Sequence, residues 1–420
     1  MSSDFSLESG ERSMGHHVPP LKRLVFAVPT RFYRDEHGAV RTNYAYARYD
    51  AWLPYLEGTK ELVLFARIVR GGGAGGQLVE GPRVQVYEQP FYSGPLGFLW
   101  TLTQQKRALS RVMNDGDSLY GTRVPNLVGP LMTERARMLG ASMFVQVTGD
   151  PEEVLKSGFG GIRQILARGF ASLGRRAVAK QVRAADGVIY VTESALQRKY
   201  PASVAAVTAV RSNVEISDEH LSSPARNYAM VDASSVRRFH LVTVGSQANK
   251  LKGHDVLLRA LQILKDRGHD LEATIVGGGR HHEELLELST ELGLDARVKF
   301  TGALAGAHLV RNEVAGADLF VMPSLSEGLP RALIEAMSGG VACIGTTAGG
   351  IPELLDEDSL CPPGSPSALA ELIERVLQEP DGLARRGREQ RARAARIKKD
   401  LTGVHILPEF FTELQKRAAR

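Results

Sequence analysis

The sequence predicts an α/β protein built from two doubly wound parallel-sheet domains. Three observations lead to this prediction. Short apolar runs of strand length alternate with helix-length segments in both halves of the chain, which is the pattern of repeated βα units. The chain has 420 residues, 43% of them hydrophobic, so it is long enough to bury two cores. A stretch rich in Ser, Pro, Asp and Asn separates the two halves.

The first half begins with residues 1–20, which we expect to be a disordered tail. They are polar and lack the hydrophobic stretch of a signal peptide. A first domain follows over residues 21–214, with a loop at residues 31–41 that carries Gly38 near its tip. Aromatic residues are dense in the expected helix at residues 43–56, where they either pack on the core or stack on a ligand ring. The expected strands are residues 23–29, 61–67, 83–87, 143–148 and 185–192.

The second half begins after a linker at residues 215–237 and forms a second domain over residues 238–400. A last helical segment covers residues 401–420. The expected strands of the second domain are residues 239–245, 271–277, 297–302 and 318–322. Helices fill the intervals between them, so the strands are expected to run parallel.

The composition excludes several classes of protein. No apolar run approaches 18 residues, so no transmembrane helix is expected. The two cysteines, Cys343 and Cys361, are too few for a disulfide framework and suit a reducing cytosol as packing residues. The net charge of +5 is modest, and no recognised nucleic-acid-binding motif accompanies it. We therefore expect a cytoplasmic protein that does not bind nucleic acid.

The most informative stretch is residues 323–340, which read Pro-Ser-Leu-Ser-Glu-Gly-Leu-Pro-Arg-Ala-Leu-Ile-Glu-Ala-Met-Ser-Gly-Gly. They follow an apolar strand. Pro330 suits the first position of a helix, and Gly339-Gly340 suit its end. The sequence therefore predicts an anion site where backbone amides open the helix, because a helix start carries partial positive charge. The residues of this site are Gly328, Leu329, Pro330 and Arg331.

Two carboxylates flank this helix start. Glu327 lies in the loop, and Glu335 lies on the apolar helix itself. A carboxylate in such surroundings needs a polar partner, and the hydroxyl groups of a sugar or a ribose would serve as donors. A surface glutamate on an amphipathic helix explains Glu335 equally well.

Glu327 and Glu335, with seven residues between them, resemble the E-x7-E signature of the retaining glycosyltransferases of family GT4, glycosyl transferases group 1. Residues 349–353 and 244–258 are also similar to that family, and the resemblance is continuous over residues 241–377. It implies a GT-B fold, in which two Rossmann-like domains face each other across a cleft and the last helix packs back on the first domain. It further implies sugar transfer from a nucleotide-diphosphate donor, the co-substrate, to an acceptor hydroxyl. Retention of the anomeric configuration is implied, with neither a metal ion nor a further cofactor.

The donor side is expected around Lys252. A lysine in a loop after a strand reaches a phosphate as a mobile point charge, and the family places it on the donor diphosphate. The family's accompanying arginine is replaced here by Ser246, so Lys250 or an arginine of the first domain is a candidate substitute. Gly277, in the turn after the next strand, belongs to the same donor-binding set. The resemblance implies that Glu335 binds the ribose and that Glu327 binds the donor sugar.

The acceptor side is expected in the first domain, because ligands of open α/β sheets bind beyond the carboxyl ends of the strands. The candidates there are Gly38, Arg123, Asn126 and Asp150. Many family members carry a histidine at about residues 149–150, which this chain lacks. Asp150 is a candidate base in its place, although a turn before a proline explains it equally well.

Three further features have a functional and a plain structural explanation. Residues 71–76 satisfy the G-x-G-x-x-G pattern but open no helix, so a surface loop is expected. Residues 156–183 are basic and amphipathic. This pattern fits either a membrane-surface helix or a solvated helix whose apolar stripe faces the core. His281 and His282 are adjacent on a helix start and do not converge on one metal ion. The arginine-rich run at residues 385–399 is expected to be a solvated helix face.

Together these observations predict a retaining, metal-independent glycosyltransferase of polysaccharide or glycolipid assembly, peripheral to the inner membrane face through residues 156–183. A sugar, a lipid-linked sugar or a small molecule would be the acceptor. A natural-product glycosyltransferase is the main alternative. Two other classes remain open, a non-catalytic nucleotide-sugar-binding partner protein and a GT-B nucleotide-sugar epimerase.

Overall fold

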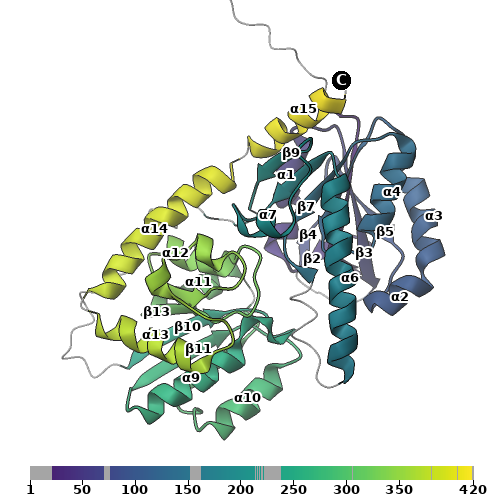
Figure 1. Ribbon diagram of the computed structural model, residues 1–420. Helices are drawn as coiled ribbons and strands as arrows, with labels where there is room; N and C mark the ends of the chain where they lie inside the picture. The colour runs from purple at the N-terminus through teal and green to yellow at the C-terminus, as the bar shows by residue number, and fades with distance from the viewer. Residues whose placement is uncertain are drawn as a thin grey trace, which may run out of the picture.

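The computed structural model describes residues 21–70, 76–151, 162–212, 214, 216, 218, 221, 238–304, 306–379, 381–403 and 405–418. They form two α/β domains, each with its own sheet flanked by helices (Figure 1). The predicted two-domain α/β architecture is confirmed. The glycine-rich run lies outside the described residues apart from Gly76.

The sheet of the N-terminal domain has the strand order β4-β2-β1-β6-β7-β8-β9. In addition, β3 pairs with β1, and β5 pairs with β3. All pairs are parallel except β1–β2 and β2–β4. Parallel strands direct their carboxyl ends to one edge, which is where open α/β sheets bind ligands. The strands are β1 (Leu24–Arg34), β2 (Val40–Thr42), β3 (Leu62–Arg70), β4 (Gln77–Leu78), β5 (Val84–Gln89), β6 (Leu119–Val124), β7 (Met143–Val147), β8 (Gly187–Tyr190) and β9 (Val207–Val210).

The prediction of a loop over residues 31–41 is partly wrong. β1 continues to Arg34 and turns into β2, with Tyr33 opposite Arg41. Asp35 stabilises the turn, since one carboxylate oxygen accepts the N–H of Ala39 at 2.9 Å and the other accepts Nε of Arg41 at 2.5 Å. This side-chain pairing, which strand periodicity does not reveal, extends the sheet beyond the apolar run.

The helices of this domain are η1 (Ala45–Ala47), α1 (Tyr49–Leu56), α2 (Gly94–Trp100), α3 (Leu102–Val112), α4 (Gly129–Leu139), α6 (Ile162–Ala184) and α7 (Ala195–Lys199). The aromatic segment at residues 43–56 is therefore two short helices. Trp52 and Tyr55 are buried, and their rings pack against Phe26 of β1. Core packing is thus the role of these two aromatic residues.

The sheet of the C-terminal domain has the order β12-β11-β10-β13-β14-β15, all parallel. After β10 the chain continues to β11 on one side, and β13 lies on the other. This change of direction makes a crevice between the carboxyl ends of β10 and β13. The strands are β10 (Phe239–Val244), β11 (Leu271–Val276), β12 (Val298–Gly302), β13 (Leu319–Met322), β14 (Ala342–Thr346) and β15 (Leu360–Cys361).

The helices of this half are η3 (Lys250–Lys252), α9 (His254–Asp266), α10 (His282–Glu291), α11 (Ala307–Gly316), α12 (Arg331–Ser338), η4 (Ile351–Glu353), η5 (Glu357–Ser359), α13 (Pro366–Gln378), α14 (Gly382–Leu401) and α15 (Ile406–Ala418).

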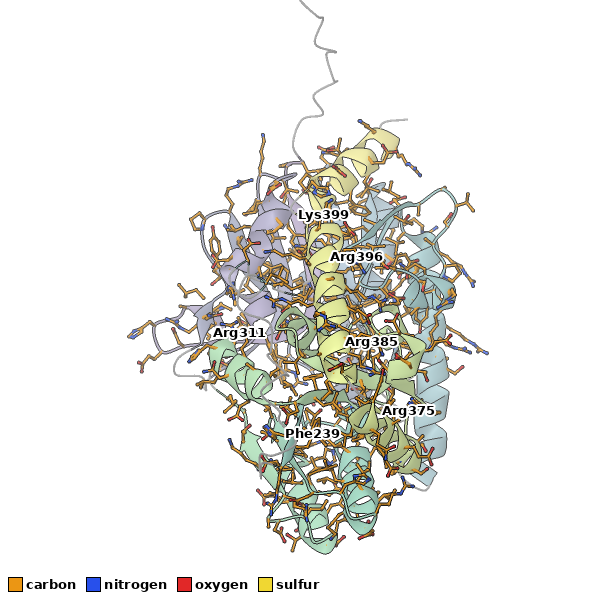
Figure 2. All side chains as sticks on the ribbon, turned by 90° about the vertical axis from the view of Figure 1, so that its left-hand side faces the viewer. Phe239, Arg311, Arg375, Arg385, Arg396 and Lys399 are labelled. Carbon is orange, nitrogen blue, oxygen red and sulfur yellow. The ribbon has the colours of Figure 1, made fainter. Side chains whose placement is uncertain are left out.

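The last two helices, α14 and α15, connect the domains. Figure 2 shows Arg385, Arg396 and Lys399 along α14, which runs from the C-terminal domain towards the N-terminal one. α15 then joins the N-terminal core through Leu407, Phe410, Phe411 and Leu414.

The arginine-rich face of α14 is not wholly solvated. Arg386 is only 3% exposed, and its guanidinium pairs with Glu379 at 2.5 Å and Asp358 at 2.8 Å. Both carboxylates lie outside α14, so the helical pattern alone gave no sign of this pairing. Cys343 and Cys361 are buried free thiols, as expected of packing residues. Within the described ranges, no helix combines the length and the apolar character that crossing a bilayer requires.

Candidate active site

The loops that follow β10 and β13 meet at an ion pair. Lys252 ends η3, and its Nζ lies 2.6 Å from Oε1 of Glu327. Ser324 Oγ donates a hydrogen bond of 2.7 Å to the same oxygen. The Glu327 side chain is 8% exposed and that of Lys252 is 30% exposed. The predicted phosphate ligand and one of the predicted carboxylates are therefore neighbours at the crevice.

Close backbone approaches fix the shape of this crevice. Gly253 has φ 64°, and a Cβ there would lie 2.0 Å from the carbonyl oxygen of Pro323. Gly277 has φ 136°, and a Cβ there would lie 1.9 Å from the carbonyl oxygen of Gly245. Only glycine satisfies both the backbone angle and the space at these positions. Gly277 therefore shapes the loop after β10, next to the predicted donor site.

Helix α12 begins beside the ion pair. Pro330 is its N-cap residue, one position earlier than predicted, and offers no capping side chain. Helix formation begins at Arg331, so the first-turn amides carry the partial positive charge of the helix start. Leu329, just before, packs against apolar clusters of both domains. The lysine and the helix start together form a site suited to an anion.

Glu335 lies on the α11 side of α12. It is half-buried and lines a cavity of about 20 Å³ together with Val244 and Arg311. Val244 ends β10, so Glu335 lies at the same edge of the sheet as Lys252. A cavity of this size has room for about one water molecule.

The predicted substitute for the family's arginine has another partner. Lys250 forms an ion pair with Glu284 of α10. Ser246 Oγ accepts the N–H of Ala248 at 3.2 Å and so stabilises a turn. Lys252 is consequently the lysine of this loop that reaches Glu327.

The N-terminal domain closes directly over the α12 loop. A Cβ on Gly328 would lie 2.2 Å from the carbonyl oxygen of Thr148, which follows β7. The guanidinium of Arg331 lies 4.6 Å from the ring centroid of Tyr46, across the two domains. Neither contact was predicted. Each joins residues more than 100 positions apart, so no local sequence pattern encodes it.

A carboxylate of the C-terminal domain caps a helix of the N-terminal domain. Glu353 accepts the backbone N–H groups of Glu193, Ser194 and Ala195 at 2.7, 2.9 and 2.6 Å, and the Ser194 hydroxyl at 3.0 Å. These groups open α7, whose N-cap residue Ser194 makes no capping bond of its own. An anion at a helix start is favourable, so Glu353 stabilises the contact between the domains.

Glu353 is also tied to the donor-side loop. Gly350, three residues earlier, donates its N–H to the carbonyl oxygen of Gly328 at 2.9 Å. Gly349 has φ 55°, and a Cβ there would lie 1.8 Å from the carbonyl oxygen of Glu327. The segment at residues 349–353 thus connects the Glu327 loop to α7. Sequence reasoning noted this segment but gave Glu353 no role.

Asp150 is buried at the end of the loop that follows β7. Its side chain is 2% exposed, pairs with Lys199 and accepts the Tyr200 hydroxyl at 2.6 Å. Burial also lowers the pKa of Lys199. These contacts favour the alternative interpretation of Asp150 as a structural carboxylate, and its role as a base stays a prediction.

The other acceptor-side candidates are spread over the N-terminal domain. Arg123 is 4% exposed, and its Nε donates a hydrogen bond of 2.9 Å to Oε1 of Gln146. Asn126 Oδ1 accepts the N–H of Val128 at 3.2 Å, just before α4. Gly38, with φ 84°, lies in the β1–β2 turn. Arg123 and Asn126 therefore lie at the carboxyl end of β6, and Gly38 lies in a different loop.

His281 and His282 have separate partners. His281 Nδ1 lies 2.8 Å from Glu284, and His282 Nδ1 lies 2.7 Å from Gln247. No group of three or more metal-ligating side chains occurs among the described residues.

His254, the first residue of α9, is a buried neighbour of the site that sequence reasoning missed. It is 3% exposed, and burial, reinforced by the positive charge of Lys252, lowers its pKa to about 4. The imidazole is thus neutral near pH 7.

Residues of the C-terminal domain are similar to a known protein family. Residues 238–379 match the family model described as glycosyl transferases group 1. Protein CapJ of Staphylococcus aureus is 23% identical over 91% of both chains. The amylovoran biosynthesis glycosyltransferase AmsK of Erwinia amylovora is 34% identical, with 30% of this chain and 33% of AmsK covered.

Solved structures establish the fold class. Sucrose-phosphate synthase from Thermosynechococcus elongatus superimposes with a TM-score of 0.69 at 17% identity, covering 95% of this chain and 99% of that one. HepE from Anabaena, solved with UDP and glucose, gives a TM-score of 0.62 at 19% identity, with 94% and 99% covered. The protein has the GT-B fold. Its C-terminal domain is similar to glycosyl transferases group 1.

Removing the Glu353 carboxylate should loosen the domain contact. We expect Glu353→Ala to lower the melting temperature and to raise the radius of gyration in small-angle scattering, because four hydrogen bonds to one charge are lost. Hydrogen bonds to charged groups contribute about 1.5–3 kcal/mol each. Glu357→Ala, at an exposed residue of the neighbouring η5, is the matched control and should change neither quantity. An unchanged scattering curve and melting temperature for Glu353→Ala would contradict this role.

Burial of neutral His254 predicts a pH-dependent stability. The unfolded chain takes up a proton near pH 6.5 and the folded chain only near pH 4, so stability falls as the pH drops through this window. Between pH 7 and pH 5 this residue should cost about 2 kcal/mol of the free energy of unfolding.

Urea unfolding at both pH values measures this loss. His254→Met should reduce the difference between the two pH values by about that amount. His37→Met removes an imidazole that is 82% exposed and should leave the difference unchanged. Equal pH dependence in wild type and His254→Met would show that His254 does not titrate in this way.

Proposed function

We propose that the protein is a retaining glycosyltransferase that moves a sugar from a nucleotide-diphosphate donor to an acceptor hydroxyl without a metal ion. The observation that carries the proposal is the pairing of Lys252 with Glu327 beside the open start of α12. The site lies at the crevice between β10 and β13, where doubly wound sheets bind nucleotides.

The donor diphosphate would lie between Lys252 and the first-turn amides of α12. Negative charge grows on this group as the sugar leaves, and fixed positive groups stabilise that charge without reorganisation. Glu327 already holds the lysine in position, so the cation is oriented before the donor arrives. The same carboxylate would accept hydroxyl groups of the donor sugar, and Glu335 those of the ribose.

Retention would follow from attack on the face that the diphosphate leaves. In this scheme a donor phosphate oxygen takes the acceptor proton, so no protein base is needed there. The buried pairing of Asp150 and the absence of a histidine at residues 149–150 are compatible with such a scheme.

The acceptor we favour is a sugar or lipid-linked sugar of polysaccharide or glycolipid assembly, with the protein in the cytoplasm and peripheral to the membrane. AmsK, a relative over 30% of this chain, is named for amylovoran biosynthesis. Within the basic stretch at residues 156–183, residues 156–161 lie outside the described residues. Farther along α6, Arg175 and Arg176 are exposed next to Leu173.

A non-catalytic nucleotide-sugar binder is the second candidate, favoured by Ser246 at the place of the family's arginine. Transfer assays distinguish the two. We would first screen UDP-, GDP-, ADP- and dTDP-sugars by thermal shift, because a ligand selective for the native state raises the melting temperature. A binder would be stabilised by one of them and transfer nothing. An epimerase would convert the donor without an acceptor.

With the donor so identified, Glu327→Gln should lower the transfer rate on the order of 100-fold or more, because Lys252 and the donor sugar lose a charged partner. Glu284→Gln is the matched control. It removes a carboxylate paired with Lys250 of the same loop but outside the crevice, so its rate should stay near that of the wild type. Equal rates for Glu327→Gln and wild type would refute the assignment of the site.

A further inference from the structure

Helix α2 presents an apolar face to the outside of the N-terminal domain. Leu96, Leu99 and Trp100 are 67%, 60% and 86% exposed. Their spacing places them on one side of the helix. Phe91, just before the helix, is 49% exposed. Large apolar side chains gathered outward in this way mark an interaction surface, because each one singly is common but a contiguous group is not.

The opposite side of α2 anchors it to the domain. Phe98 is buried and meets the buried Tyr92 edge to face, with ring centroids 5.0 Å apart. The guanidinium of Arg67 lies 4.4 Å from the Tyr92 ring centroid. The helix therefore has a fixed orientation, and Leu96, Leu99 and Trp100 are its outward side. We call these three residues the α2 apolar face.

The chain segment that contains this face carries cations but no acidic side chain. Residues 89–114 contain no Asp or Glu, and the exposed Glu88 just before them lies 3.8 Å from Arg34. The basic residues of this segment, Lys106, Arg107 and Arg111, are all exposed on α3, which continues from α2. An apolar face that is followed along the chain by an exposed cationic helix face is complementary to an anionic lipid surface.

We propose that the α2 apolar face inserts into the interface of an anionic bilayer, with the cations of α3 at the headgroups. Trp is well suited to this boundary, since its ring is apolar and its N–H is polar. A second copy of the chain fits less well, because a symmetric contact would oppose the same patch and its like charges. One short amphipathic helix binds weakly, so the attachment is reversible.

The face lies where a membrane-bound acceptor would be useful. α2 follows β5, and β5 runs parallel to β3 and β1. Its carboxyl end therefore lies at the same edge of the sheet as that of β7, after which Thr148 meets Gly328. Figure 1 shows α2 at the lower end of α3. A bilayer held there would present lipid-attached substrates to the edge that faces the C-terminal domain.

Tryptophan fluorescence tests the insertion directly. The chain has two tryptophans. Trp52 is 1% exposed and donates its indole N–H to the carbonyl oxygen of Ala47 at 3.0 Å, so it is already shielded. A blue shift on adding vesicles therefore reports Trp100. We expect the shift, together with co-sedimentation, for phosphatidylcholine vesicles that contain phosphatidylglycerol, with loss of binding at high salt. Pure phosphatidylcholine should give little of either.

Matched variants separate the apolar and the charged contributions. Leu96→Ser with Leu99→Ser should weaken vesicle binding about tenfold or more, because burial of the two leucines is lost. Val204→Ser, at a fully exposed apolar residue away from α2, should bind as the wild type does. Lys106→Glu with Arg107→Glu should abolish the preference for anionic vesicles. Melting temperatures equal to that of the wild type would show that the variants are folded.

Two results would overturn the proposal. The first is wild-type protein that shows neither co-sedimentation nor a blue shift with anionic vesicles. The second is a concentration-dependent dimer in sedimentation velocity that the Leu96→Ser, Leu99→Ser variant lacks, which would assign the face to a second copy. Neither experiment uses a sugar donor, so its failure is distinguishable from a failure of the proposed transferase activity.

Discussion

The ion pair between Lys252 and Glu327 joins the two loops that enclose the crevice of the C-terminal domain. The Glu327 side chain is almost fully buried, and a carboxylate in that position is stable only with partners. Lys252 and Ser324 supply them. Removing the lysine charge would leave the buried carboxylate of Glu327 without its cation, which usually costs several kcal/mol. The pair is therefore a structural requirement as well as the element to which we assign the donor chemistry.

From this pair the contacts extend outward to the other domain. Glycines at positions 349 and 350 let the segment that ends at Glu353 lie on the Glu327 loop, and Glu353 in turn caps α7. Gly328 touches Thr148 on the same side. The residues that contact the other domain and the loop to which we assign the donor are therefore directly connected.

The sequence was sufficient where the information is local. Alternating strands and helices predicted the sheets, and residues 318–340 predicted the strand, loop and helix that hold Glu327. The sequence was not sufficient where a contact depends on distant partners. Asp150 pairs with Lys199 and Tyr200, some 50 residues later, and strand patterns identify neither partner. The partners of Glu353 lie about 160 residues away, and no spacing rule identifies them.

The most direct test of the donor site is a crystal structure of the protein with a bound nucleoside diphosphate. The account predicts that the phosphates lie between Nζ of Lys252 and the backbone amides at the start of α12, with the ribose hydroxyls at Glu335. A diphosphate bound elsewhere, with the crevice between β10 and β13 closed and the Lys252–Glu327 pair undisturbed, would contradict it.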